Sequence, residues 1–184
     1  MTESVTVLLD AHRNGDASAM DRLAALLYPE LKQVARRRAG SGRGSGATTL
    51  VQETFVKLLS GGNIKARDRQ QFFALAATIM RQIIVDEIRY FTANKRAGNE
   101  VTLTQSVIGD DSHEKAQFLL QVNQMLEILE AEDSRLTRVF ECRYFAGLTA
   151  EETATALDTS TRSAERLWSE ARARIAALIA QDNA

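Results

Sequence analysis

The sequence predicts an all-α protein made of two small helical domains, and three observations carry this prediction. The 184 residues include a single proline, Pro29, and no convincing strand-like alternation of apolar and polar residues. Apolar residues recur instead at helical spacing along most of the chain. That periodicity is lost in residues 97–113, which predicts a linker between a domain of residues 1–96 and a domain of residues 114–184.

Composition excludes several classes of protein. Hydrophobic residues make up 45% of the chain, as in globular proteins, and no run of about 18 apolar residues could cross a membrane. The N-terminus lacks the basic and apolar features of a signal peptide, so we expect a cytoplasmic location. The single cysteine, Cys142, excludes an internal disulfide, and with two distant histidines we expect neither a metal site nor a cofactor. No acid–base pair or nucleotide-binding loop indicates an enzyme.

The net charge of −1 conceals an uneven distribution along the chain. Residues 1–100 hold 15 Lys and Arg against 10 Asp and Glu, whereas residues 101–184 hold 8 against 14. For nucleic-acid binding, local clusters of charge matter more than the sum.

The first domain is expected to contain four helices. Gly15 ends the first helix and Asp16 caps the second. Residues 39–47 read AGSGRGSGA, which is too rich in glycine for a helix and predicts a loop. The four helices are expected at about residues 3–12, 16–38, 50–59 and 70–94.

The helix at 70–94 combines a wide apolar surface with a basic face. Phe72, Ala76, Ile79 and Ile83 form one apolar stripe, and a second stripe adjoins it. Two adjoining stripes predict burial against several neighbours. The three arginines at positions 81, 89 and 96 fall within a sector of roughly 80°, at about 100° per residue.

The second domain is expected to end in a helix-turn-helix. Thr149 and Glu152 have the spacing of a capping box, which starts one helix. The next helix follows after Asp158-Thr159-Ser160, where Asp158 replaces the usual turn glycine and tolerates a left-handed conformation. The helices of this domain are expected at about residues 114–131, 134–145, 149–157 and 161–180.

One face of the last helix carries side chains that can bind DNA. Arg162, Glu165, Arg166 and Ser169 recur at spacings of three and four residues. Arginine and serine can reach guanine edges and phosphates in the major groove, and glutamate can accept a hydrogen bond from cytosine. The alternative is an ordinary helical hairpin with solvated charges.

Three segments, in their order along the chain, resemble an extracytoplasmic-function (ECF) sigma factor. They read LVQETFVKLL at 50–59, FFALAATIMRQIIVDEIR at 72–89 and RVFECRYFAGLTAEETATALDTSTRSAERLWSEARARI at 138–175. The resemblance implies a promoter-specificity subunit of bacterial RNA polymerase, with core polymerase and promoter DNA as partners. A helix-turn-helix regulator that acts without core polymerase is the alternative.

The resemblance also assigns roles by position. It places Gln52 and Glu53 at the surface that binds the clamp of the largest polymerase subunit. Asn63 would line a pocket for a flipped base of the −10 element. Arg81, Asp86 and Arg89 would belong to the −10 region, Arg162, Glu165, Arg166 and Ser169 would face the −35 major groove, and Trp168 would be core.

The positions before the clamp-binding helix depart from the family pattern. Members usually carry acidic residues there, whereas this chain has Gly46-Ala47-Thr48-Thr49. A phosphate on threonine would restore the missing negative charge, so a Ser/Thr protein kinase is an expected partner. Thr49 starts a capping box with Gln52, which makes Thr48 the first choice for phosphorylation, with Thr49 as the other candidate. An anti-sigma factor or the level of expression would be the alternative means of control.

Overall fold

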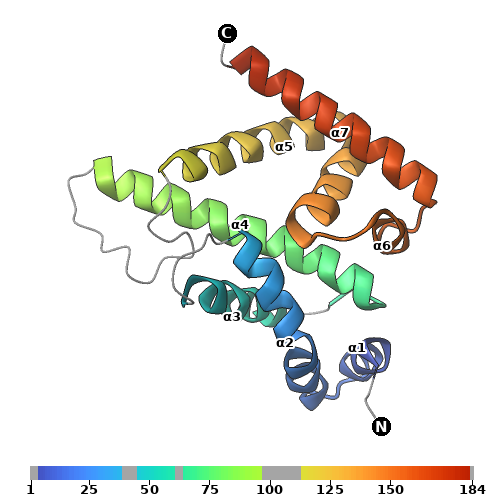
Figure 1. Ribbon diagram of the computed structural model, residues 1–184. Helices are drawn as coiled ribbons and strands as arrows, with labels where there is room; N and C mark the ends of the chain where they lie inside the picture. The colour runs from blue at the N-terminus through green and yellow to red at the C-terminus, as the bar shows by residue number, and fades with distance from the viewer. Residues whose placement is uncertain (1–3, 39–44, 61–63, 97–112, 183–184) are drawn as a thin grey trace.

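The computed structural model describes residues 4–38, 45–60, 64–96 and 113–182, and within these ranges every regular element is a helix (Figure 1). The predicted all-α class is confirmed. None of the described helices is long and apolar enough to span a bilayer. The elements are α1 (Val5–Arg13), α2 (Ser18–Arg38), α3 (Ser45–Ser60), α4 (Arg69–Arg96), α5 (His113–Phe140), the π-helical segment η2 (Glu141–Ala146), α6 (Ala150–Ala156) and α7 (Thr161–Asp182).

The described residues up to 96 form an N-terminal block in which successive helices pack on each other. Ser4 caps α1 by accepting a hydrogen bond from the Val7 N–H. Gly15, at φ +94°, reverses the chain, and the Asp16 carboxylate accepts from the Ser18 N–H at 2.9 Å. The end of α1 at Gly15 and the cap at Asp16 were predicted from the sequence, whereas the cap at Ser4 was not. Together they position α2 for packing against α1 and α3.

Helix α3 begins at Ser45, although the sequence predicted a loop up to residue 47 and a helix from about residue 50. The side chain of Ala47 is buried, and Leu50 and Val51 are fully inaccessible. Burial of these side chains against α2 and α4 offsets the cost of about 1 kcal/mol for one glycine in a helix. The prediction of a loop is therefore wrong for residues 45–47, and residues 39–44 lie outside the described part of the chain.

Helix α4, the last helix of the N-terminal block, packs against the C-terminal block, which comprises the described residues from 113 onward (Figure 1). It packs on α3 at one side and on η2, α6 and α5 at the other. Phe72, Ala76 and Met80 are at most 1% exposed. Contact with neighbours on two sides explains the two apolar stripes of this helix. The predicted linker of residues 97–113 lies outside the described residues except at its last position.

Helix α5 contains a break at Asp133, whose φ of −155° and ψ of 102° are non-helical. The predicted boundary between residues 131 and 134 therefore exists as a kink. The Asp133 carboxylate accepts a hydrogen bond from the Arg135 N–H at 3.0 Å, so it caps the second half of the helix. The Arg135 guanidinium, which also donates to this carboxylate, lowers the pKa of Asp133 to about 2.

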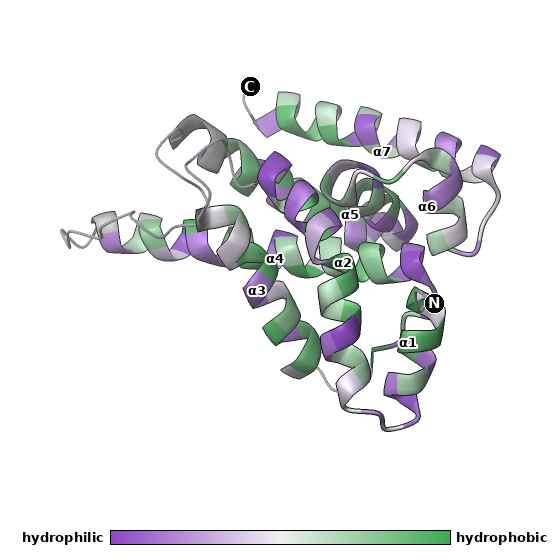
Figure 2. Ribbon diagram, turned by 60° about the horizontal axis from the view of Figure 1, so that its bottom comes forward, coloured by the Kyte–Doolittle hydropathy of each residue, from purple (hydrophilic) through white to green (hydrophobic). Residues whose placement is uncertain are grey.

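Helix α6, a short turn and helix α7 follow one another where the sequence predicted a helix-turn-helix. Thr149 and Glu152 form a complete capping box at the start of α6. Asp158 adopts the left-handed conformation, at φ 51°, in the turn before α7. Ala154 and Ala164 are buried where α6 meets α7. Figure 2 shows hydrophobic and hydrophilic residues alternating along α7, which lies along α5 with its apolar side.

Candidate functional site

The first candidate surface is one face of α7. The four side chains predicted to face a DNA groove are all exposed. They lie on one side of the first three turns of the helix: Arg162, Glu165, Arg166 and Ser169. Arg166 also donates to Glu170 at 3.2 Å, one turn further along the helix. Leu167 and Ala171 point to the opposite side and are buried. An exposed polar face at the N-terminal half of the second helix is the arrangement that a helix-turn-helix uses in the major groove.

Trp168 is partly buried and packs against the hydrophobic core. Its ring lies 5.5 Å from the Phe140 ring. The guanidinium groups of Arg143 and Arg172 lie over the indole at 5.7 and 5.6 Å, where cation–π attraction holds them. The indole therefore anchors α7 to the rest of the block.

The second candidate surface is the outer face of α3, which we define as Gln52, Glu53, Val56 and Leu59. Gln52 and Glu53 are exposed, as the clamp-binding prediction requires. Val56 and Leu59 are 60% and 50% exposed, although both are large and apolar. Apolar side chains beside exposed polar ones are typical of a protein-binding surface. Sequence reasoning missed Val56 because it sought polar partners only.

Thr48 and Thr49 lie within the first turns of α3, and both are partly buried. The predicted capping box of Thr49 with Gln52 is wrong, because the helix begins four residues earlier, at Ser45. The prediction that Thr48 lies outside the helix is wrong for the same reason. Both threonines remain close to the helix N-terminus, where an anion is favoured.

The three predicted −10 residues of α4 do not share one face. Asp86 points toward α3, and its carboxylate lies 3.5 Å from the Lys57 ammonium. Arg81 and Arg89 point toward α5, where Arg89 lies 3.4 Å from Glu127. Five residues of helix rotate a side chain by about 140°, so Arg81 and Asp86 cannot contact the same ligand group. Asn63 lies outside the described residues.

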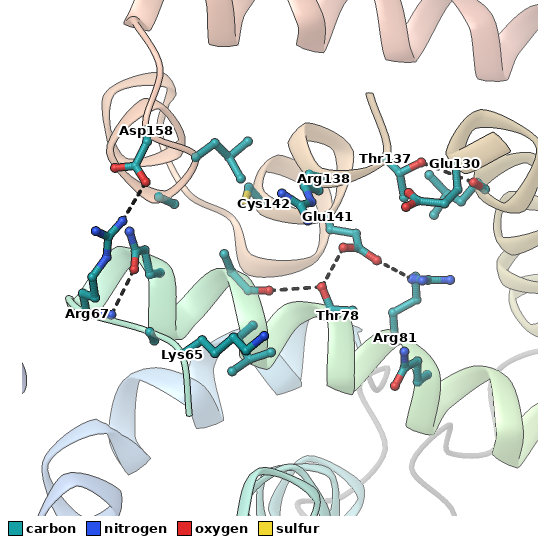
Figure 3. Close-up of a pocket in the computed structure, with 18 of the residues that line it drawn as sticks. Lys65, Arg67, Thr78, Arg81, Glu130, Thr137, Arg138, Glu141, Cys142 and Asp158 are labelled. Atoms are coloured by element: carbon teal, nitrogen blue, oxygen red, sulfur yellow. Dashed lines mark hydrogen bonds and ion pairs between the residues drawn. The ribbon is translucent and has the colours of Figure 1, made fainter. Parts of the chain in front are cut away.

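Arg81 is held in a nearly buried polar network (Figure 3). Its Nε donates to Glu141 Oε1 at 2.8 Å, and its Nη1 donates to Asn123 Oδ1. The hydroxyl of Thr78 donates to Glu141 Oε2 at 2.6 Å. The side chains of Arg81 and Glu141 are only 15% and 7% exposed. Both oxygens of Glu141 are thus satisfied by α4, and Arg81 is engaged within the protein.

Sequence reasoning missed the partners of Arg81. Glu141 stands in the run VFECRYF, where its neighbours Phe140 and Cys142 are buried. Burial of a carboxylate among apolar side chains is unfavourable unless a cation pairs with it. The sequence therefore indicates that Glu141 has a basic partner. Only the fold shows that this partner is Arg81.

A cleft of about 900 Å³ lies between α4 and the C-terminal block. Its lining carries both signs of charge, from Lys65 and Arg138 to Glu130 and Asp158. Arg67 spans one end, where it donates to Asp158 at 2.9 Å (Figure 3). The described part of the chain contains no group of His, Cys, Asp and Glu suited to a metal ion. Two ion pairs of the cleft lining, Arg67–Asp158 and Arg81–Glu141, join the two blocks.

Comparison with known proteins gives one family match. The model of the family described as "ECF sigma factor" matches residues 2–181 of the chain. Among solved structures, the one titled "Structure of CnrH in complex with the cytosolic domain of CnrY" is 19% identical, with a TM-score of 0.44, over 98% of this chain and 99% of that chain. No curated protein matches the chain.

Proposed function

Because the chain belongs to the ECF sigma factor family, a family of alternative sigma factors that act in transcription initiation, we propose that it directs bacterial RNA polymerase to a specific set of promoters. The exposed polar face of α7 is the observation that supports this proposal most directly. Arg162, Glu165, Arg166 and Ser169 would read the −35 element there. The protein would do so in the cytoplasm as a regulator rather than an enzyme.

Core polymerase would bind the outer face of α3. Gln52 and Glu53 would form polar contacts with the clamp of the largest subunit, while Val56 and Leu59 would lose their exposed apolar surface. The −10 element would be bound through Arg81, Asp86, Arg89 and Asn63. Phosphate contacts would position the strand, and flipped bases would carry the sequence information.

Run-off transcription with core polymerase and genomic fragments tests this proposal. We expect discrete transcripts that require both this protein and core enzyme. An electrophoretic shift of the same fragments separates the two candidate classes. If the protein alone binds the fragments specifically and core enzyme adds neither affinity nor transcripts, the protein is a helix-turn-helix regulator instead.

We further propose that phosphorylation of Thr48 or Thr49 by a Ser/Thr protein kinase activates core binding. The positions before Leu50 lack the acidic residues usual in the family. A phosphate adds about −1.5 to −2 charges, and near the first turn of α3 it is favoured by the helix dipole. The first turn of a helix is also easily opened, because its N–H groups lack helical partners, so a kinase can gain access to it.

The phosphorylation proposal is tested by replacing each of the two threonines with alanine and with glutamate. Thr48→Ala or Thr49→Ala should abolish activity in stimulated cells, according to which residue is modified, and glutamate there should restore part of it. Ser60→Ala, at the exposed end of the same helix, is the control. Mass spectrometry should locate the phosphate. If unmodified protein binds core polymerase as tightly as the phosphorylated form, control lies with an anti-sigma factor or with expression.

A further inference from the structure

A groove of about 350 Å³ lies between α3 and α4, on the side of α4 that packs on α3. Ile83 is buried beneath it, and the rings of Tyr90 and Phe91 line it about two turns further along α4. The two rings contact edge to face, with centroids 5.8 Å apart. The Tyr90 side chain is nevertheless 61% exposed. The groove therefore presents an aromatic surface to the outside of the protein.

The lining of the groove carries an excess of negative charge. It includes three carboxylates, Glu53, Asp86 and Glu87, against one ammonium group, Lys57. Lys57 lies 3.5 Å from Asp86, and the two side chains are 45% and 65% exposed, so solvent screens their pair. Asp86 stands four residues before Tyr90 and so lies on the same side of α4. Two negative charges thus remain in excess beside an exposed aromatic ring.

We propose, on the basis of the function proposed above, that this groove receives an arginine or lysine side chain of core polymerase. Carboxylates form strong, charge-assisted hydrogen bonds with a guanidinium or ammonium group. The face of a tyrosine ring attracts the same cation, and the apolar stem of a long basic side chain packs on apolar neighbours. Asp86 and Tyr90 together provide both kinds of contact.

The position of the groove favours core polymerase as its occupant. Glu53 belongs both to the groove and to the outer face of α3, and Val56 of that face is 60% exposed. A protein that buries Val56 therefore also reaches the groove. A DNA phosphate is excluded from it, because the excess of carboxylates repels another negative group. Asp86 thus binds protein rather than the −10 element.

The groove also supplies negative charge to the core-binding surface independently of phosphorylation. The positions before Leu50 lack the acidic residues usual in the family, whereas Asp86 and Glu87 stand on the neighbouring helix. Opposite charges across an interface accelerate association and favour the correct partner. The two carboxylates of α4 therefore contribute affinity for core polymerase in either phosphorylation state.

Binding of the full chain to purified core polymerase tests the inference, measured by biolayer interferometry at low and high salt. Asp86→Asn removes one carboxylate of the groove, and Tyr90→Ala removes its exposed ring. The matched controls are Glu132→Gln and Phe118→Ala, which make the same kinds of change at exposed positions of α5. All proteins are compared in the same phosphorylation state.

We expect Asp86→Asn and Tyr90→Ala each to raise the dissociation constant about fivefold, while the two controls leave it within about twofold of the parent value. The effect of Asp86→Asn should shrink at high salt, because salt screens charge pairs. Lys57→Met should lower the dissociation constant about threefold, since it removes the cation that competes for Asp86 within the protein.

Equal dissociation constants for the parent protein and both groove variants overturn the inference. Weaker binding by both Asp86→Asn and Lys57→Met also overturns it, because the pair of these two residues would then serve only to hold α3 on α4. Circular dichroism confirms folding, and if Asp86→Asn fails to fold, Tyr90→Ala decides the outcome. Failure of the parent protein to bind core polymerase in either phosphorylation state would instead reject the proposed function.

Discussion

Cys142 shows how burial sets the chemistry of a single residue. The thiol is 1% exposed on η2, and burial, together with the negative charge of Glu141, raises its pKa to about 12. In the unfolded chain the pKa of a cysteine is about 8.5. The free energy of unfolding is therefore unaffected by this thiol below about pH 8.5. It falls as the pH rises from there toward 12, because the thiol ionises in the unfolded chain and not in the folded protein.

We predict that alkylation of Cys142 at about pH 9 is slower in the folded protein than in guanidinium by roughly a thousandfold, because thiolate is the reactive form. Mass spectrometry of the time course measures both rates. Comparable rates in the two conditions would show that the thiol is accessible and ionised in the native state.

Arg166 is the side chain of the α7 face whose removal should be most informative. We predict that Arg166→Ala reduces transcription from the cognate promoter and leaves core binding unchanged, because a bidentate base contact contributes about 1–3 kcal/mol of discrimination. Arg174→Ala is the control, since Arg174 pairs with Glu132 at the side facing α5. Equal transcription by Arg166→Ala and the parent protein would remove Arg166 from promoter recognition.

At the scale of single residues, the sequence predicted which side chains of α7 are exposed, because helical periodicity alone separates Arg166 from Leu167. It could not predict the state of Arg81. Periodicity places Arg81 on a basic face, but whether that face meets solvent or Glu141 depends on contacts between residues 60 positions apart.

Among the elements, α6 and α7 agree most closely with the predictions made from local sequence patterns. The capping box, the turn at Asp158 and the small residues at the crossing each act within a few positions of the chain. Helix α3 did not, since burial of Ala47 overrides the glycines before it. Local patterns predict an element when its stabilising interactions are local. They fail where packing against side chains distant in the sequence determines where the element begins.

We predict that Thr149→Ala destabilises the C-terminal block by about 1 kcal/mol, because the Glu152 N–H at the start of α6 loses the Thr149 hydroxyl as its acceptor. Chemical denaturation of the full chain followed by circular dichroism measures the change. Thr155→Ala is the matched control, because Thr155 is exposed on the same helix and bonds only to the Glu151 carbonyl. A loss of similar size in both variants would assign the effect to helix α6 in general.

For the whole molecule, the sequence predicted two domains but not their contact. Buried side chains of both blocks belong to one continuous hydrophobic cluster that passes through α4. The division into domains at residues 97–113 therefore stays a prediction, and its test is the behaviour of the separated parts.

We predict that limited proteolysis cuts first within residues 97–113 and that fragments 1–96 and 114–184 are each helical. Because ion pairs such as Arg81–Glu141 and Arg89–Glu127 join the two blocks, the mixed fragments should associate, more weakly as salt is raised. Mass spectrometry of early digests and circular dichroism of the fragments measure these outcomes. Early cuts within α4 would contradict the domain division.

The left-handed turn residue Asp158 has a consequence for how such proteins can diverge. It closes the turn of the helix-turn-helix and also accepts the hydrogen bond of Arg67 from the other block. Glycine is the better residue for a left-handed turn but cannot accept that bond. A single base change converts any aspartate codon into a glycine codon, so one mutational step would favour the left-handed turn before α7 and remove one contact of this turn with Arg67. Selection at this codon therefore acts on the stability of the turn and on one contact between the two blocks together.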